Sequence, residues 1–116
     1  MKKVLIVEDE NNLLKLYDME FNDAGFEVHG CSTKAETLEY LKNNNPDIII
    51  LDIKLPDNKG SELLLKIKEV KNEIPVIIYT AYTNLRHDRN FWAADDFVIK
   101  SGDIFELITK VKTKLL

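Results

Sequence analysis

The sequence contains a single cysteine, no excess of basic residues and no long hydrophobic run, and each shortage excludes a class of protein. Cys31 alone cannot form an internal disulfide or a multi-cysteine zinc site, which agrees with a reducing cytoplasm. The 16 Lys and Arg residues are outnumbered by 20 Asp and Glu, so the net charge of −4 does not favour contact with nucleic-acid phosphates. Only four apolar residues follow Met1-Lys2-Lys3, too few for a signal peptide or a membrane span. We therefore expect a cytoplasmic protein with no direct nucleic-acid or membrane contact.

The length and composition fit one globular domain. The chain has 116 residues, of which 45% are hydrophobic and 31% charged, the balance of an ordinary globular protein. Folding at this length buries roughly 65% of the surface of the unfolded chain, so a core can form without disulfides or metals. We expect residues 1–116 to form a single domain.

Short apolar runs predict the strands of a buried parallel sheet. They are rich in β-branched residues and do not alternate with polar residues, as expected of strands covered on both faces. The four runs are 4–7, 48–51, 76–79 and 97–99. A more mixed segment, 26–30, predicts a fifth strand at an edge of the sheet.

Between these runs, apolar residues recur every three or four positions, which is the period of a helix. The helical segments run from Leu13 to Ala24, from Ala35 to Leu41, from Leu63 to Val70 and from Ile104 to Leu115. Gly25 supplies a C-terminal stop, and Thr33-x-x-Glu36 has the form of a capping box. Strict alternation of strands and helices predicts βαβ units with helices on both faces of a parallel sheet.

The segment 83–94 has the weakest helical pattern. Leu85, Phe91 and Trp92 form only a poor apolar stripe, and we expect a short helix there. Phe91 and Trp92 are expected to fill the core, the alternative being an exposed anchor for a partner.

Ionisable and hydroxyl side chains stand directly after the apolar runs, at the ends of strands where ligands bind in such sheets. They are Glu8, Asp9, Glu10, Asp52, Thr80 and Lys100. Taken singly, each could be a helix cap or a solvated charge. Together, the carboxylates would repel one another unless a cation shared the site, and an all-oxygen cluster suits Mg²⁺. A lysine and a hydroxyl facing that ion would suit a phosphoryl group, so the pattern predicts phosphoryl transfer onto an acid.

These motifs, in this order and spacing, resemble the receiver domain of two-component response regulators, the CheY-like family. The resemblance runs from Lys3 to about Lys114 and rests on 7–10, 51–56 with Gly60 shortly after, 79–81 and 97–100. It implies an α/β fold of the flavodoxin-like (βα)5 type. The five-stranded parallel sheet would be doubly wound, with strand order 2-1-3-4-5.

The resemblance also implies roles for the acidic residues. Asp52 is similar to the phosphoacceptor, a nucleophile that becomes an acyl phosphate. Asp9 resembles a direct ligand of Mg²⁺ or Mn²⁺, and Glu8 one that acts mainly through water. Asp52 itself and the backbone carbonyl of Lys54 are the further ligands that the resemblance implies.

Residues near the later strands resemble the phosphoryl-binding and switching parts of the family. Lys100 matches the lysine that pairs with a phosphoryl oxygen, and the backbone N–H of Ala81 is implied as a donor. Thr80 resembles the residue whose hydroxyl turns toward the phosphoryl group. Phe97 resembles the aromatic residue that moves inward as that threonine moves. Lys54 and Tyr82 occupy the positions implied to modulate access of water to the site, and both are bulky. We expect this bulk to give a long-lived phosphorylated form.

Two departures from the family pattern affect the region after Thr80. Ser101 follows Lys100 at a position where the family commonly has Pro, often after a cis peptide bond. The peptide bond between Lys100 and Ser101 is therefore expected to be either trans or strained. The stretch from Thr80 to Lys100 is about two residues shorter than usual. This shortening falls on 83–94, part of the family's usual output face together with the last strand and last helix.

The leading hypothesis is a phosphorylation-dependent switch in a phosphorelay, which accepts phosphate from a sensor histidine kinase or a histidine phosphotransfer protein. It would catalyse only its own phosphorylation and dephosphorylation, and would act on an effector domain or a downstream protein. A flavin carrier is disfavoured because three acids would repel the flavin phosphate. A phosphatase would need a second general acid near Asp52. A degenerate receiver that acts as a phosphorylation-independent interaction module is the main alternative, which the intact acids, Thr80 and Lys100 disfavour.

Overall fold

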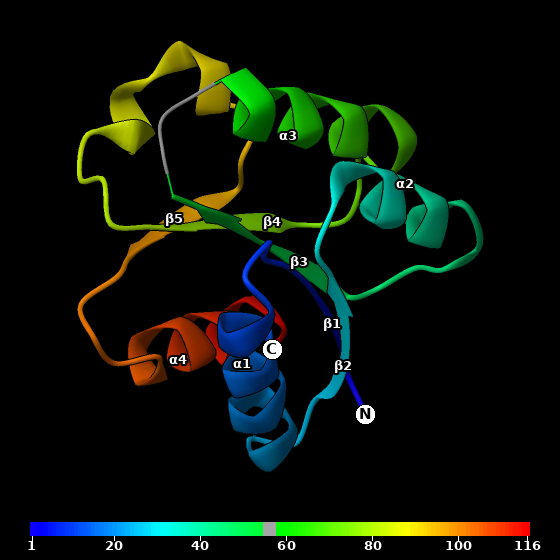
Figure 1. Ribbon diagram of the computed structural model, residues 1–116, viewed down its shortest axis with the longest axis vertical. Helices are drawn as coiled ribbons and strands as arrows, with labels where there is room; N and C mark the ends of the chain where they lie inside the picture. The colour runs from blue at the N-terminus through cyan, green and yellow to red at the C-terminus, as the bar shows by residue number, and fades with distance from the viewer. Residues whose placement is uncertain (55–57) are drawn as a thin grey trace.

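The chain alternates strands with helical segments in the computed structural model, which describes residues 1–54 and 58–116 (Figure 1). The strands are β1 (Lys3–Val7), β2 (Glu27–Cys31), β3 (Ile48–Ile53), β4 (Val76–Thr80) and β5 (Asp96–Ile99). The helices are α1 (Asn11–Asp23), α2 (Lys34–Asn43), α3 (Asn58–Val70) and α4 (Phe105–Lys114). Two single 3-10 turns, η1 (Leu85–His87) and η2 (Arg89–Phe91), lie between β4 and β5.

The five strands form one parallel sheet in the order β2-β1-β3-β4-β5, which confirms the predicted fold class and strand order. Helices α1 and α4 cover one face and α2 and α3 the other (Figure 1). The register pairs Val7 with Leu51, so Glu8 and Asp52 follow at the same edge. Chain order along the sheet reverses between β1 and β3, the place where such folds bind ligands.

The core has two layers because strand side chains alternate between the faces of the sheet. Ile6, Ile50 and Ile77 are buried with α1 and α4 on one face. Leu51 and Ile78 are buried with α2 and α3 on the other. Burial on both faces explains why the strands carry near-continuous apolar runs.

Local sequence signals end and begin the helices as predicted. Gly25 follows α1 with φ of 96°, a conformation that glycine adopts without steric cost. Thr33 caps α2, its hydroxyl accepting from the Glu36 N–H at 3.0 Å. Glu36 reaches back to the N–H of Ser32 at 2.8 Å, one residue before the position expected in a capping box.

The short helix predicted within 83–94 is wrong, because the described chain forms only η1 and η2 there. Leu85 and Phe91 are both buried, but an α-helix would turn them to different faces. Asp88, with ψ of 120°, separates the turns and accepts from the N–H of Asn90 at 2.9 Å. Phe91 fills the core as expected, whereas Trp92 is 64% exposed and lies under Arg89, so its core assignment is wrong.

Across the described ranges, no helix has both the length and the apolar character that crossing a bilayer requires.

Phe91 should anchor the η1–η2 segment, and Trp92 should contribute little to stability. Phe91→Ala would leave a cavity beside α3 and is expected to lower the free energy of unfolding by about 3 to 4 kcal/mol. Trp92→Ala should cost less than about 1 kcal/mol, since it removes an exposed ring and one cation–π contact. Urea unfolding followed by circular dichroism measures both; equal losses would contradict this packing.

Candidate functional site

The carboxyl ends of β1, β3, β4 and β5 bring the predicted site residues to one edge of the sheet. Glu8 directly follows β1, Thr80 ends β4 and Lys100 directly follows β5. Asp52 is the penultimate residue of β3, and its side chain is buried. The sheet therefore assembles residues that lie far apart in the sequence, as the strand pattern predicted.

Both carboxylate oxygens of Asp52 are held by hydrogen bonds. Lys100 Nζ donates to Oδ1 at 2.7 Å, and the hydroxyl of Tyr17 donates to Oδ2 at 3.1 Å. No peptide bond in the described chain is cis, so Ser101 does not prevent Lys100 from reaching Asp52. The Lys100 backbone N–H also donates to the carbonyl of Thr80 at 2.7 Å, which fixes the start of the loop after β5.

Tyr17 is a site residue that the sequence analysis did not single out; it falls within the helical segment predicted from Leu13 to Ala24. It lies on α1, is 7% exposed, and packs edge-on against Tyr79 with ring centroids 6.0 Å apart. Burial and the charge of Asp52 raise the pKa of the Tyr17 phenol well above its ordinary value, so the hydroxyl remains a donor at neutral pH. The sequence did contain a signal for this role: a tyrosine, which carries a hydroxyl, occupies an apolar position of the predicted helix two turns after Asp9.

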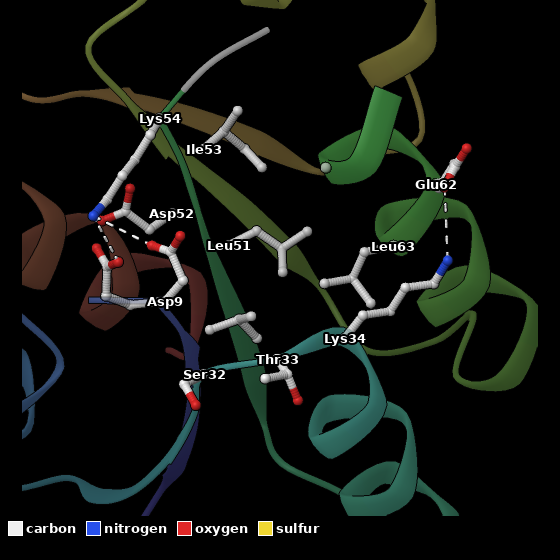
Figure 2. Close-up of a pocket in the computed structure, with 13 residues that line it drawn as sticks. Asp9, Ser32, Thr33, Lys34, Leu51, Asp52, Ile53, Lys54, Glu62 and Leu63 are labelled. Atoms are coloured by element: carbon white, nitrogen blue, oxygen red, sulfur yellow. Dashed lines mark ion pairs between the residues drawn. The ribbon is translucent and has the colours of Figure 1, made fainter. Parts of the chain in front are cut away.

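The Lys54 ammonium lies among the acids that follow β1 (Figure 2). Its Nζ is 3.0 Å from Glu8 Oε2, 3.3 Å from Asp9 Oδ1 and 3.0 Å from Glu10 Oε2. Burial opposes the charge, but hydrogen bonds to the three carboxylates outweigh it and raise the pKa of Lys54. Lys54 therefore offsets part of the negative charge of the acidic cluster.

Glu8 is the buried member of that cluster. Its Oε2 accepts from the Glu10 N–H at 2.8 Å, while Oε1 has no hydrogen-bond partner among the described residues. Burial, followed by the nearby carboxylate of Asp52, raises the pKa of Glu8 to about 7. The interaction with Glu8 lowers the pKa of Asp9, so Asp9 is the more acidic of the two carboxyl groups.

The donor chemistry fits a hard divalent cation. All side-chain donors are carboxylate oxygens, and the unpartnered Oε1 of buried Glu8 offers a free ligand atom. Among residues 1–54 and 58–116, however, no three acidic, His or Cys side chains are already arranged to hold a metal. A divalent cation would therefore have to displace Lys54 from the acids.

Thr80 and Phe97 lie on the same face of the sheet, in the neighbouring strands β4 and β5. Thr80 is buried, and its hydroxyl accepts from the Tyr82 N–H at 3.1 Å. Register pairs Phe97 with Ile78, two residues before Thr80, and its partly buried ring packs on the core beneath α3. Tyr82 is 36% exposed and Ala81 is exposed, so both are accessible at this edge.

A cleft of about 510 Å³ leads from solvent to the acids. Its acidic end is formed by Asp9, Asp52 and Lys54 (Figure 2). Its other end lies between α2 and α3, where Lys34 and Glu62 form an ion pair at 3.7 Å. The cleft therefore leads a small molecule or a partner side chain to the residues that surround the buried carboxylate.

Removing the Lys54 charge should destabilise the protein when divalent cations are absent. Lys54→Met leaves buried Glu8 without its counterion, and we expect a loss of about 1 kcal/mol, limited because Glu8 can take up a proton. Lys34→Met is the matched control, because its ion pair with Glu62 is solvent-exposed and should contribute little. Thermal unfolding in a chelator makes the comparison; equal midpoints for both variants would contradict the assigned role of Lys54.

Known proteins resemble this chain over nearly its whole length. Residues 4–112 match the family of response regulator receiver domains. Response regulator ArlR of Staphylococcus saprophyticus is 33% identical over 118 residues, which cover 99% of this chain and 53% of ArlR. The chain thus spans about half the length of this relative.

Solved structures support the same assignment. The response regulator protein TrrA from Thermotoga maritima, solved in complex with Mg²⁺ and BeF, is 39% identical with a TM-score of 0.88, covering 100% of both chains. TrrA in complex with the histidine kinase ThkA is also 39% identical, with a TM-score of 0.87, covering 100% of this chain and 99% of that one. With the strand order and the acidic edge already described, these matches show that the chain belongs to the response regulator receiver domains of two-component systems.

Proposed function

We propose that residues 1–116 form a single cytoplasmic receiver domain whose Asp52 accepts a phosphoryl group from a phosphohistidine. The observation that carries this proposal is the buried Asp52 carboxylate, held by Lys100 at the acidic end of the cleft. The complex of the related TrrA with a histidine kinase supports a sensor kinase, or a histidine phosphotransfer protein, as the phosphodonor. The domain would catalyse only its own phosphorylation and dephosphorylation.

The acids are proposed to hold Mg²⁺ or Mn²⁺. The related TrrA binds Mg²⁺ with BeF, and the unpartnered oxygen of Glu8 fits such an ion here. Asp9, Asp52 and the Lys54 carbonyl are the proposed direct ligands, with Glu8 acting through water. When bound, the ion would neutralise charge on the phosphoryl oxygens.

In the proposed transfer, an Asp52 oxygen forms a bond to phosphorus as the bond from phosphorus to the imidazole nitrogen breaks. The electron pair of that bond stays on the imidazole. Lys100 would move from the carboxylate to a phosphoryl oxygen, and the N–H of Ala81 would donate to another. Thr80 would turn its hydroxyl from the Tyr82 N–H toward the phosphoryl group, and Phe97 would move into the space released.

This switch would change the surface formed by η1, η2, β5 and α4. The two 3-10 turns take part in this surface because they stand where a helix was predicted over 83–94. Phe97 lies in β5 and packs on the core cluster that contains Phe91 of η2. Trp92 is exposed beside that turn. An effector domain or a downstream protein would read this altered surface.

Incubation with phosphoramidate and Mg²⁺ should phosphorylate the parent protein on Asp52 alone, and Asp52→Asn should abolish the reaction. Asp47→Asn is the matched control, because Asp47 lies before the opposite end of β3 and binds the Lys3 N–H. Intact mass and peptide mapping make the measurement. Labelling that persists in Asp52→Asn or with a chelator would contradict the proposal, and a parent that takes no label would favour a phosphorylation-independent interaction module.

Trimming Lys54 and Tyr82 to alanine should shorten the life of the phosphorylated form. Lys54 is bulky and lies at the acidic end of the cleft, and Tyr82 lies two residues after the switch residue Thr80. Both are therefore proposed to limit entry of water. A roughly tenfold faster loss of phosphate would correspond to about 1.4 kcal/mol of barrier. Lys34→Ala, at the far end of the cleft, should decay like the parent; a trimmed variant with the parent's rate would refute the shielding role.

A further inference from the structure

Tyr17 makes a direct contact with the proposed phosphoacceptor. Its hydroxyl donates to Asp52 Oδ2 at 3.1 Å, from the middle of α1. Lys100 takes the other oxygen, Oδ1, at 2.7 Å. The two donors therefore hold the carboxylate from different elements, so its two oxygens are not equivalent.

The position of Tyr17 is well determined by packing. The side chain is 7% exposed, and its ring contacts Tyr79 in an edge-on arrangement with 72° between the planes. Tyr79 in turn lies under Lys100, with Nζ 5.3 Å from the ring centroid. The hydroxyl of Tyr17 thus lies at one end of a packed set of side chains that surrounds Asp52.

We propose that Tyr17 is a positioning residue for phosphoryl transfer at Asp52, its hydroxyl holding Oδ2 so that Oδ1, beside Lys100, faces the incoming phosphorus. This inference rests on the proposed function. A carboxylate oxygen can accept more than one contact, so Oδ2 can keep the hydroxyl of Tyr17 while it also binds a cation.

The same hydrogen bond should affect loss of the phosphoryl group. In hydrolysis, a water oxygen bonds to phosphorus and the Oδ1–phosphorus bond breaks. Its electron pair returns to the carboxylate, and water releases a proton to solvent. The Tyr17 hydroxyl on Oδ2 stabilises the negative charge that develops on the departing carboxylate, because a donor binds an anion more strongly than a neutral acyl oxygen.

The test follows the decay of the phosphorylated full chain after removal of phosphoramidate, in Mg²⁺. Tyr17→Phe keeps the ring and removes the donor, and it should lose phosphate roughly two- to tenfold more slowly than the parent. Tyr79→Phe is the matched control, because it removes a hydroxyl from the same ring pair, whereas the donors to the Asp52 carboxylate are Tyr17 and Lys100; its decay should equal the parent's. During labelling, Tyr17→Phe should change the maximal rate and leave the half-saturating phosphoramidate concentration unchanged, which a general packing defect would not do.

A fluorinated tyrosine at position 17 provides a second arm that keeps the side chain nearly isosteric. Its more acidic hydroxyl is a stronger donor, so phosphate loss should become faster than in the parent. Parent-like decay in Tyr17→Phe, an equal effect in Tyr79→Phe, or slower decay with fluorotyrosine would overturn the positioning role. Should Tyr17→Phe not fold, the fluorinated protein decides alone. A parent that takes no label at Asp52 would overturn the proposed function and this inference together.

Discussion

The ion pair between Lys100 and Asp52 is the contact on which the arrangement of this edge depends. A buried carboxylate is costly without a partner, and its partner here comes from a position 48 residues later in the chain. The 2.7 Å separation depends on two features of the fold. Strand β4 lies between β3 and β5 and sets their relative register, and the turn after β5 directs Lys100 toward Asp52. The fold therefore determines the electrostatics of the site. The ion pair in turn holds the carboxyl ends of β3 and β5 together, with β4 between them.

A second cation, Lys54, offsets part of the charge of the remaining acids. Lys54 contacts Glu8, Asp9 and Glu10, so the charge of the cluster is offset from within the chain. Under the proposed function, a divalent ion and Lys54 compete for the same carboxylates, and Lys100 and the phosphoryl group compete for Asp52. Phosphorylation would then exchange one set of charge pairs for another without leaving a buried charge unpaired, which is how a small chemical change could reach Thr80 and Phe97.

The parallel sheet and the meeting of Asp52 with Lys100 could be predicted because they follow from apolar runs and from the geometry of parallel strands, whereas the strand order was implied by the resemblance to receiver domains. The segment containing Trp92 could not, because a sparse apolar stripe does not distinguish a helix from two turns separated by Asp88. Tyr17 was missed because helix periodicity assigns a residue to the core without showing what its polar tip contacts. The contacts of the Lys54 side chain with the acids that follow β1 depend on side-chain placement, which strand and helix patterns do not determine.

The chemical identity of the phosphorylated residue tests the account most directly. Borohydride reduces an aspartyl phosphate to homoserine, so reduction of the phosphorylated protein followed by peptide sequencing should find homoserine at position 52 and leave the other aspartates intact. Homoserine at another position, or a phosphate on Ser, Thr or His that survives reduction, would contradict the claim that the carboxylate held by Lys100 and Tyr17 is the phosphoacceptor.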